Sequence, residues 1–479
     1  MDSYINKEVV IIGNGPSAIS LSYMLSGHWP YYTSQSHPNE YLHRRLTDES
    51  ELNKSLVEQD LEMLSDGLEG RSINKVSVLF DHLNHPEADF GFENPSTLEW
   101  RHRSDKVVDH VVIGKGLPGG AWHSMNDCKE ILTISLGSWM QLPDMDIRNW
   151  CSEHRRESRV SLSTVANYYN NYVKTKGLMK NFKHFSSVTS LEFDEQTNKY
   201  RIDGHDSNGN HFHYMSPRVV LATGNCDRVN RMNVPGEDLP FVLHSLNELE
   251  TLIAESKVKP SSDPILIVGA AESKVKPSSD PILIVGAGLS AADAVIATRF
   301  RRVPTIHAFR RHPEDPSLIF NQLPENMYPE YHCVHSKMKG KFTSSCGYEP
   351  LAMHCVKEIK ANKEVLLLNM IGVDDTQLTT CVKVKVSYVL VLIGMKPNLN
   401  FIKSKSLLAD LGIKKNVGID PRSNPIAINS YTHESLASPG LYAMGPIVGD
   451  NFVRFVQGGA LAITHHIHSH NNNDPSFCQ

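Results

Sequence analysis

Residues 8–25 read EVVIIGNGPSAISLSYML, and this stretch joins a short apolar run to a glycine turn and an amphipathic segment. The apolar run has the length of a buried strand, and the residues after the turn have the apolar spacing of a helix. In such a unit, Gly13 permits the tight turn, Gly15 lets the backbone approach a pyrophosphate, and Ala18 keeps the helix close to the strand. We therefore predict that this turn, with Ser17 in it, binds a dinucleotide.

The pattern occurs again at residues 281–297, which read PILIVGAGLSAADAVIA. A predicted buried strand is again followed by a glycine turn and by a helix with one apolar face. We predict that Gly286, Gly288, Ser290 and Ala291 bind a second dinucleotide.

The charge after this second unit indicates which dinucleotide binds there. A strand predicted at Val303–Phe309 ends in Arg310 and Arg311, about 20 residues after the glycines, where NAD enzymes carry an acid and NADP enzymes an arginine for the 2′-phosphate. The second cofactor is therefore predicted to be NADPH. The alternative is that both arginines are ordinary solvated charges.

A tandem duplication precedes the second turn: residues 254–270 are repeated without change as residues 271–287. Only the second copy continues into the full glycine pattern, because the first loses its second glycine after Gly269. We expect the second copy to form the strand. A solenoid needs several repeats that stack, so the spare copy indicates a recent duplication or an error in the gene model.

The first unit lacks an acidic residue at the usual distance of about 20 residues, where such a residue holds the ribose hydroxyls. A mostly polar, charge-rich stretch stands there instead, and the next apolar strand is predicted at Val107–Ile113. We interpret residues 29–105 as an insertion into the first domain.

Composition narrows the classes of function. The 479 residues suit two nucleotide-binding domains and an appendage, at roughly 100–200 residues per domain. Basic residues number 48 and acidic residues 53, and neither sign forms a long block, which excludes the electrostatic footprint of a nucleic-acid binder. The apolar runs are shorter than the roughly 20 residues of a membrane-spanning helix. A small-molecule substrate is the expected partner, although the sequence does not identify it.

The cysteine and histidine patterns indicate reduced thiols and no metal site. The eight cysteines are far apart and no CxxC occurs, which favours the cytoplasm or nucleus. The histidines and cysteines between His332 and Cys355 match no zinc-binding spacing, and the histidines from His465 to His470 are expected in a fraying polar tail. No side-chain motif for catalysis is visible, so no catalytic residue is assigned.

Several further segments resemble flavin-containing monooxygenases and related flavoproteins. PRVVLATG, residues 217–224, resembles the strand and turn where a flavin domain leads into a nicotinamide domain, and LPGGAW, residues 117–122, resembles a GGxW element near the flavin. By this resemblance the ribose-binding glutamate would fall at Gly114, where Lys115 or a backbone carbonyl could substitute. The resemblance assigns cofactor contacts to Gly119, Gly120, Trp122, Ala222, Thr223, Gly224, Gly445 and Asp450.

The longest matches identify the chain as a member of the oxidative stress-induced growth inhibitor family. They include GPIVGDNFVRFVQGGALA at residues 445–462, DFGFENPS at residues 89–96 and DPSLIFNQLPENMYPEYH at residues 315–332. The resemblance implies an α/β fold with two Rossmann-like domains: an FAD domain from residues 1–28, 106–250 and 386–479, and an NADPH domain at residues 263–385.

The resemblance also implies the function. It indicates an FAD- and NADPH-dependent monooxygenase linked to oxidative stress and to the regulation of growth, differentiation or cell death. The alternative is a regulatory protein that keeps the flavoprotein fold with little or no catalysis and acts through protein partners. Gly114 favours that alternative, as does Ile134 or Ser135 in the place where flavin-containing monooxygenases carry an asparagine near the flavin. The two intact glycine turns and Arg310 with Arg311 favour the enzyme.

Overall fold

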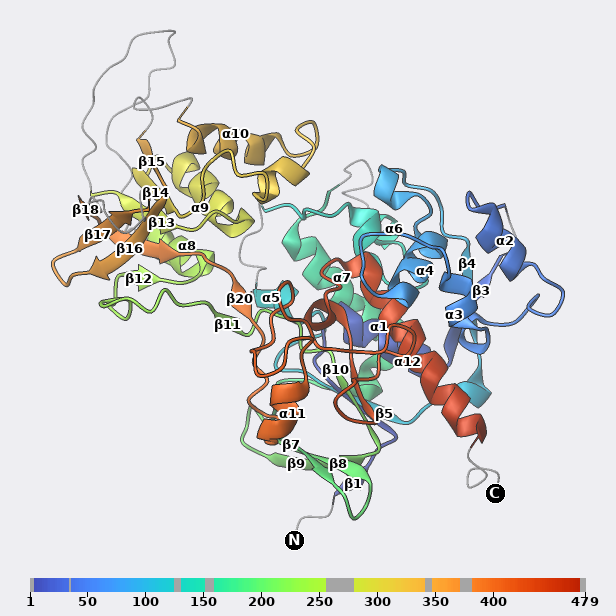
Figure 1. Ribbon diagram of the computed structural model, residues 1–479. Helices are drawn as coiled ribbons and strands as arrows, with labels where there is room; N and C mark the ends of the chain where they lie inside the picture. Colours follow the sequence, from blue (N-terminus) through green and yellow to red (C-terminus); the bar gives the residue numbers. More distant parts are fainter. Residues whose placement is uncertain are drawn as a thin grey trace. The chain divides into compact units, whose positions relative to one another are not determined.

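The computed structural model describes residues 4–33, 36–124, 131–150, 159–255, 280–340, 347–370 and 381–473. The chain forms two compact units, whose elements are labelled in Figure 1. Unit 1 comprises Met1–Arg228 and Lys396–Gln479, and unit 2 comprises Val229–Met395. The chain leaves unit 1 at β11 (Arg228–Val229) and returns at β20 (Met395–Lys396).

Unit 1 is built on a five-stranded parallel sheet with the strand order β21–β10–β2–β5–β6. The central strand, β2 (Val9–Ile12), is buried along its whole length between β10 and β5. Because helices or further sheets cover both faces of a parallel sheet, its inner strands are mostly apolar, and β2 is apolar throughout. The other four strands are β5 (His110–Ile113), β6 (Phe182–Lys183), β10 (Arg218–Leu221) and β21 (Leu441–Ala443).

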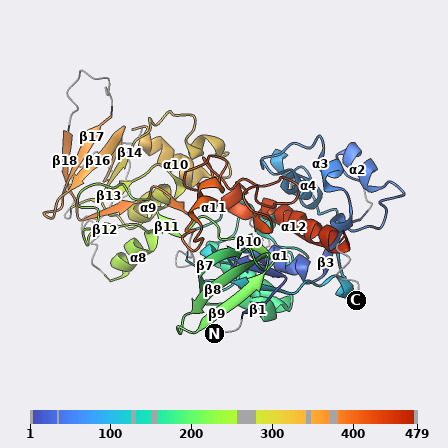
Figure 2. The same ribbon diagram turned by 60° about the horizontal axis from the view of Figure 1, so that its bottom comes forward.

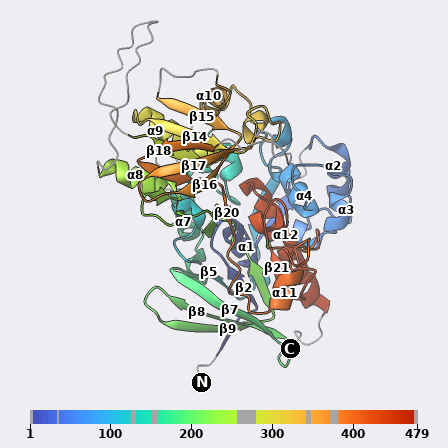
Figure 3. The same cartoon turned by 60° about the vertical axis from the view of Figure 1, so that its left-hand side comes forward.

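The two faces of this sheet pack against different layers. Val9 and Ile11 belong to a core with α1 (Pro16–Leu25), α7 (Leu162–Thr175) and α12 (Val453–Asn473), since alternate side chains of a strand point to opposite faces. Val10 and Ile12 face the second layer, a four-stranded sheet whose strands β7, β8 and β9 run together in Figures 2 and 3. That sheet consists of β1 (Ile5–Asn6), β9 (His211–Ser216), β8 (Lys199–Asp206) and β7 (Ser186–Asp194).

Residues 29–105 add no strand to the central sheet, and they pack on α12. Strand β3 (His28–Tyr32) pairs with β4 (Leu98–His102), separately from the other sheets. Helix α4 (Lys75–Asn84) buries Leu79 and Phe80 in the core that contains α12, beside which it lies in Figures 1 and 3. The remaining helices of unit 1 are α2 (Glu40–Leu46), α3 (Leu61–Ser65), α5 (Ala121–Ser124), α6 (Ile147–Trp150) and α11 (Lys405–Asp410).

Unit 2 has its own five-stranded parallel sheet with the order β12–β19–β13–β14–β15. A three-stranded antiparallel sheet of order β16–β17–β18 packs in the same core. The elements of unit 2 are β12 (Val242–Leu243), α8 (Leu246–Ala254), β13 (Ile282–Val285), α9 (Leu289–Phe300), β14 (Thr305–Phe309), α10 (Pro329–Met338), β15 (Tyr348–Ala352), β16 (His354–Ile359), β17 (Glu364–Asn369), β18 (Cys381–Lys385) and β19 (Tyr388–Val391).

The predicted α/β class with two Rossmann-like sheets is confirmed, but the boundary between the units differs from the expected one. Residues 229–250 and 386–395, which the sequence placed in the first domain, lie in unit 2. The physical reason is strand pairing, because β12 and β13 both pair in parallel with β19. The second copy of the duplicated segment supplies β13, whereas the first copy from residue 256 onward lies outside the described residues. Within the described ranges, no helix is long and apolar enough to cross a membrane.

Candidate functional site

The first glycine turn of unit 1 is a tight connection between β2 and α1. Gly13 has a φ of +116°, and a Cβ on it would lie 2.1 Å from the carbonyl oxygen of Ala222 at the end of β10. No other residue fits here, because both the backbone conformation and the neighbouring backbone exclude a side chain. Its N–H donates to the carbonyl of Ile113 at 2.8 Å, so the turn is also bonded to the end of β5.

Gly15 forms an open cradle at the start of α1. It is the N-cap residue of the helix, no side chain caps the helix there, and a Cβ on Gly15 would meet no atom within 4 Å. The first amides of a helix attract an anion when no side chain caps them. The space and the donors therefore fit a pyrophosphate, and Ser17 and Ala18 lie in the first turn of the same helix.

The predicted glycines after β5 lie against this cradle. The N–H of Gly119 donates to the carbonyl of Asn14 at 2.8 Å, and a Cβ on Gly120 would lie 3.2 Å from Cα of Gly15. Trp122 is partly buried, and its ring lies 6.2 Å from that of Tyr169. The structure thus brings Gly119 and Gly120 to the first turn. Ala222 is beside Gly13, and Thr223 and Gly224 follow it in the chain.

Of the two predicted residues near the C-terminus, the structure brings one to the turn. A Cβ on Gly445 would lie 2.4 Å from Oγ of Ser17, so Gly445 packs against the first turn of α1. Asp450 is buried, and its carboxylate accepts hydrogen bonds from Ser72 at 2.5 Å and from Ser77 at 2.8 Å, both in the 29–105 segment. Burial raises the pKa of the Asp450 carboxyl from 3.8 to about 6, against the opposing effect of these hydroxyls.

Gly114, where the resemblance put a ribose-binding acid, has no room for a side chain while the Asn14 side chain lies beside it. A Cβ there would lie 2.1 Å from Cγ of Asn14, a residue that the sequence analysis did not single out. Lys115, the suggested substitute, instead forms an ion pair with Asp227 at 2.6 Å. A glycine pattern does not specify the residue between its two glycines, so no sequence signal marked Asn14.

The second turn, in unit 2, repeats the geometry of the first. Gly286 has a φ of +139°, and a Cβ on it would lie 2.2 Å from the carbonyl oxygen of Leu392. Gly288 is the N-cap residue of α9, again with no side-chain cap and with open space around its Cβ position. Ser290 is exposed and Ala291 is buried in the first turn of α9.

A buried histidine supports this second turn. His307 on β14 contacts the carbonyl of Gly286 at 2.7 Å and the hydroxyl of Tyr348 at 2.8 Å. Burial lowers the pKa of His307 from 6.5 to about 4, so the ring is neutral near pH 7. Its Nε2–H donates to the carbonyl, which leaves Nδ1 to accept from the tyrosine hydroxyl.

The two predicted phosphate-binding arginines follow β14, which is the neighbour of β13. Both are exposed. Arg311 donates to the hydroxyl and to the carbonyl of Ser317, whereas no contact of Arg310 with another described residue is found. Arg310 is thus the more available of the two for a ligand.

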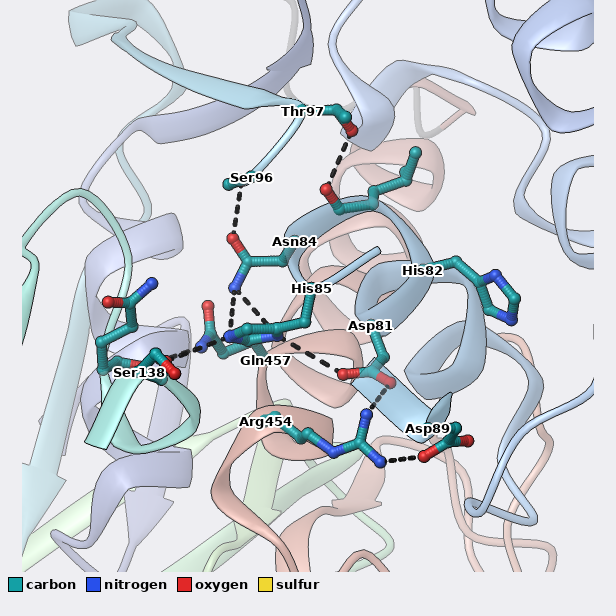
Figure 4. Close-up of polar contacts among 12 residues, drawn as sticks. Asp81, His82, Asn84, His85, Asp89, Ser96, Thr97, Ser138, Arg454 and Gln457 are labelled. Atoms are coloured by element: carbon teal, nitrogen blue, oxygen red, sulfur yellow. Dashed lines mark hydrogen bonds and ion pairs between the residues drawn. The ribbon is translucent and has the colours of Figure 1, made fainter. Parts of the chain in front are cut away.

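A buried polar cluster joins α4 to α12 and to the η4 turn (Gly137–Met140), as Figure 4 shows. Arg454 of α12 donates to both Asp81 and Asp89, and His85 lies 3.4 Å from Asp81 and 3.3 Å from the carbonyl of Ser138. Removing one partner from such a buried ion-pair network strongly lowers the stability of a protein, because it leaves a buried charge without compensation. The cluster therefore fixes the 29–105 segment to the helix that follows Gly445 and Asp450.

The histidine-rich C-terminal region differs from its prediction. The histidines from His465 to His470 lie on α12, so the expected fraying tail is wrong for them. Tertiary contacts order this polar sequence, since His465 contacts the carbonyl of Val57 and His466 contacts the hydroxyl of Tyr442. In the part of the chain that the structure describes, no group of three or more acidic, histidine or cysteine side chains is arranged to hold a metal ion; Cys346 lies outside that part.

Comparison with known proteins gives matches over most of the chain. Residues 108–460 match the family described as pyridine nucleotide-disulphide oxidoreductase. The human protein named oxidative stress-induced growth inhibitor 2 is 42% identical to this chain, over 97% of the chain and 93% of that protein.

Two solved structures show the same fold at low sequence identity. The bacillithiol disulfide reductase from Bacillus cereus has a TM-score of 0.59 at 16% identity, covering 97% of this chain and all of that one. The ornithine hydroxylase from Pseudomonas aeruginosa has a TM-score of 0.57 at 13% identity, covering 98% of this chain and all of that one. One of these proteins is named as a reductase and the other as a hydroxylase, so the shared fold does not choose between the two reactions.

Proposed function

The chain belongs to the oxidative stress-induced growth inhibitor family, within the pyridine nucleotide-disulphide oxidoreductases, and from this premise we propose that it is an FAD- and NADPH-dependent monooxygenase-like enzyme. The wider family implies the use of a flavin and a pyridine nucleotide, and the names of the relatives link the chain to oxidative stress and growth. NADPH is the proposed electron donor and O2 the oxidant: one oxygen atom enters a small-molecule substrate, and the two electrons from NADPH reduce the other to water.

One observation carries the flavin assignment: the open, uncapped start of α1 at Gly15, behind a turn that only Gly13 can make. The amides of α1 would hold the FAD pyrophosphate. Gly120 and Gly445 pack against the start of α1 and have no side chain that would fill the space of the pyrophosphate. The matching start of α9 at Gly288 would hold the pyrophosphate of NADPH, with Arg310 on the 2′-phosphate.

When bound, FAD would supply the redox chemistry, as an acceptor of hydride from the nicotinamide and a donor of electrons to oxygen. The chain's own contribution is to bind and orient the two cofactors. Dithiol chemistry of the disulfide-reductase kind is disfavoured, because the sequence has no CxxC pair. The four described cysteines are free, which suits the cytoplasm or nucleus as the place of action.

Gly114 supports a second candidate, a regulatory protein that keeps the fold and works through protein partners in growth control. A ribose-binding acid is absent at that position, and the Asn14 side chain fills the space beside it. The two candidates differ in a measurable property, because only the enzyme must bind FAD and oxidise NADPH.

The test uses valine at each cradle. Gly15 and Gly288 have extended backbone angles and open space around the Cβ position, so Gly15→Val and Gly288→Val should fold, with the new side chain occupying the pyrophosphate space. We expect FAD absorbance in the unmodified protein and in Gly288→Val, but not in Gly15→Val. NADPH oxidation should be lost in both variants and kept in Gly418→Ala, a control with equally open surroundings. Folded, unmodified protein that takes up no FAD would contradict the enzyme and favour the regulatory protein.

A further inference from the structure

The side chain of Asn14 and any side chain at Gly114 exclude one another. Asn14 lies between the two glycines of the first turn, only 4% exposed. A Cβ on Gly114 would be 2.1 Å from Cγ and 2.2 Å from Nδ2 of Asn14. Because Gly114 has no Cβ, the Asn14 side chain can occupy the space at the end of β5 where a Rossmann fold usually has its ribose-binding acid.

Hydrogen bonds fix the orientation of the Asn14 amide. Nδ2 donates to the carbonyl oxygens of Gly116 at 2.8 Å and Leu117 at 3.0 Å. A carbonyl oxygen can only accept a hydrogen bond, so the amide nitrogen must face these two carbonyls. Oδ1 therefore points away from them. Both donor hydrogens of the amide are used, and only the acceptor is left.

Oδ1 of Asn14 lies at the glycine cradle without a donor. It is 3.6 Å from the position of a Cβ on Gly120, and Gly120 in turn packs on Gly15. None of the described residues donates a hydrogen bond to this oxygen. This oxygen is not among the fully buried acceptors that lack a partner, so a ligand hydroxyl placed over the cradle can reach it and donate to it.

We propose that Asn14 Oδ1 accepts a hydrogen bond from a hydroxyl of the adenosine ribose of the dinucleotide in unit 1, in place of the missing acid. This inference rests on the proposed FAD site and names the residue that recognises the adenosine half. Lys115 does not compete for the role, because it pairs with Asp227 and its side chain is 63% exposed. If Asn14 takes the role of the acid, the glycine at position 114 is no argument against FAD binding.

The experiment measures the discrimination between FAD and analogues whose adenosine ribose lacks the 2′- or the 3′-hydroxyl. Affinities are obtained from the change in flavin fluorescence when full-length apoprotein is titrated. We expect the unmodified protein to bind FAD about 5–10-fold more tightly than one of the analogues, the usual effect of one neutral hydrogen bond. In Asn14→Ala this ratio should fall to about one, whatever the variant does to overall affinity.

A double variant, Asn14→Gly with Gly114→Glu, tests independently of Asn14→Ala whether this space holds the adenosine ribose. It removes the clash at position 114 and places an acid at the end of β5, so it should bind FAD more tightly than one of the deoxy analogues. FMN, which has no adenosine, should bind equally to the unmodified protein and to both variants.

Equal binding of FAD and both analogues by the unmodified protein, or discrimination that survives Asn14→Ala, would overturn the assignment of Asn14 and leave the FAD site standing. A folded protein that binds no flavin at all would overturn the proposed function, and this inference with it.

Discussion

Replacing Asp450 by asparagine should change how the stability of the protein depends on pH. The Asp450 carboxyl is buried against Ser72 and Ser77, and burial raises its pKa from 3.8 to about 6. The folded protein therefore holds this proton more tightly than the unfolded chain. The stabilisation is fully present below pH 3.8 and is lost as the pH rises through 6.

The size of the effect follows from the two pKa values. At 1.36 kcal/mol per pH unit, the difference between 3.8 and 6 corresponds to about 3 kcal/mol of unfolding free energy at pH 8. Asparagine imitates the protonated carboxyl in shape and charge, and its oxygen can still accept from Ser72. The Asp450→Asn variant should thus lose little stability at pH 4 and be more stable than the unmodified protein at pH 8, by up to about 3 kcal/mol.

The assay is urea denaturation of both proteins between pH 4 and 8, read as the difference in unfolding free energy. Buried histidines such as His307 and His433 titrate in the opposite sense, since burial lowers their pKa to about 4 and their stabilisation is lost as the pH falls. Their contribution is the same in both proteins and cancels in the difference. A difference that stays constant with pH would refute the reasoning. The Asp450 carboxylate already accepts hydrogen bonds from the two serines, so Asp450→Asn should change FAD affinity little.

Three further predictions follow from packing and charge. Gly458→Ala should lower the unfolding free energy by about 1–3 kcal/mol in urea denaturation, because the new Cβ would lie 2.3 Å from Cα of Ser77 on α4, and a gain in stability would contradict the close contact. Replacing Arg310 and Arg311 by alanine should weaken NADPH binding about 10–100-fold and leave NADH unchanged, measured at one salt concentration, whereas equal affinities in the unmodified protein would refute the assignment. Deleting residues 254–270 should leave the melting temperature unchanged, because residues 281–287 already supply β13 and its turn; a large decrease would show that the spare copy is part of the core.

The parallel strands were the most predictable part of the fold. Strands β2, β10 and β13 occur where the sequence has short apolar runs, because burial on both faces leaves few polar positions in such strands. The antiparallel strands β7–β9 were not predicted. One face of each is partly exposed, so polar residues interrupt the pattern. The histidines of α12 were expected in a fraying tail for a related reason. Contacts with distant residues such as Val57 order this polar sequence, and the local sequence does not show them.

The candidate site shows the same limit at the level of single residues. The spacing of Gly13 and Gly286 predicted two turns, but the groups that exclude any other residue there are backbone carbonyls of Ala222 and Leu392, which lie more than a hundred residues further along the chain. Both turns bond to a neighbouring strand, since the N–H of Gly286 donates to the carbonyl of Ala308 on β14 at 3.1 Å, and the second turn also accepts a hydrogen bond from buried His307. A glycine pattern specifies where a backbone must turn, since only that requirement is local. The residues that shape the space above the turn come from other strands, and only the folded chain identifies them.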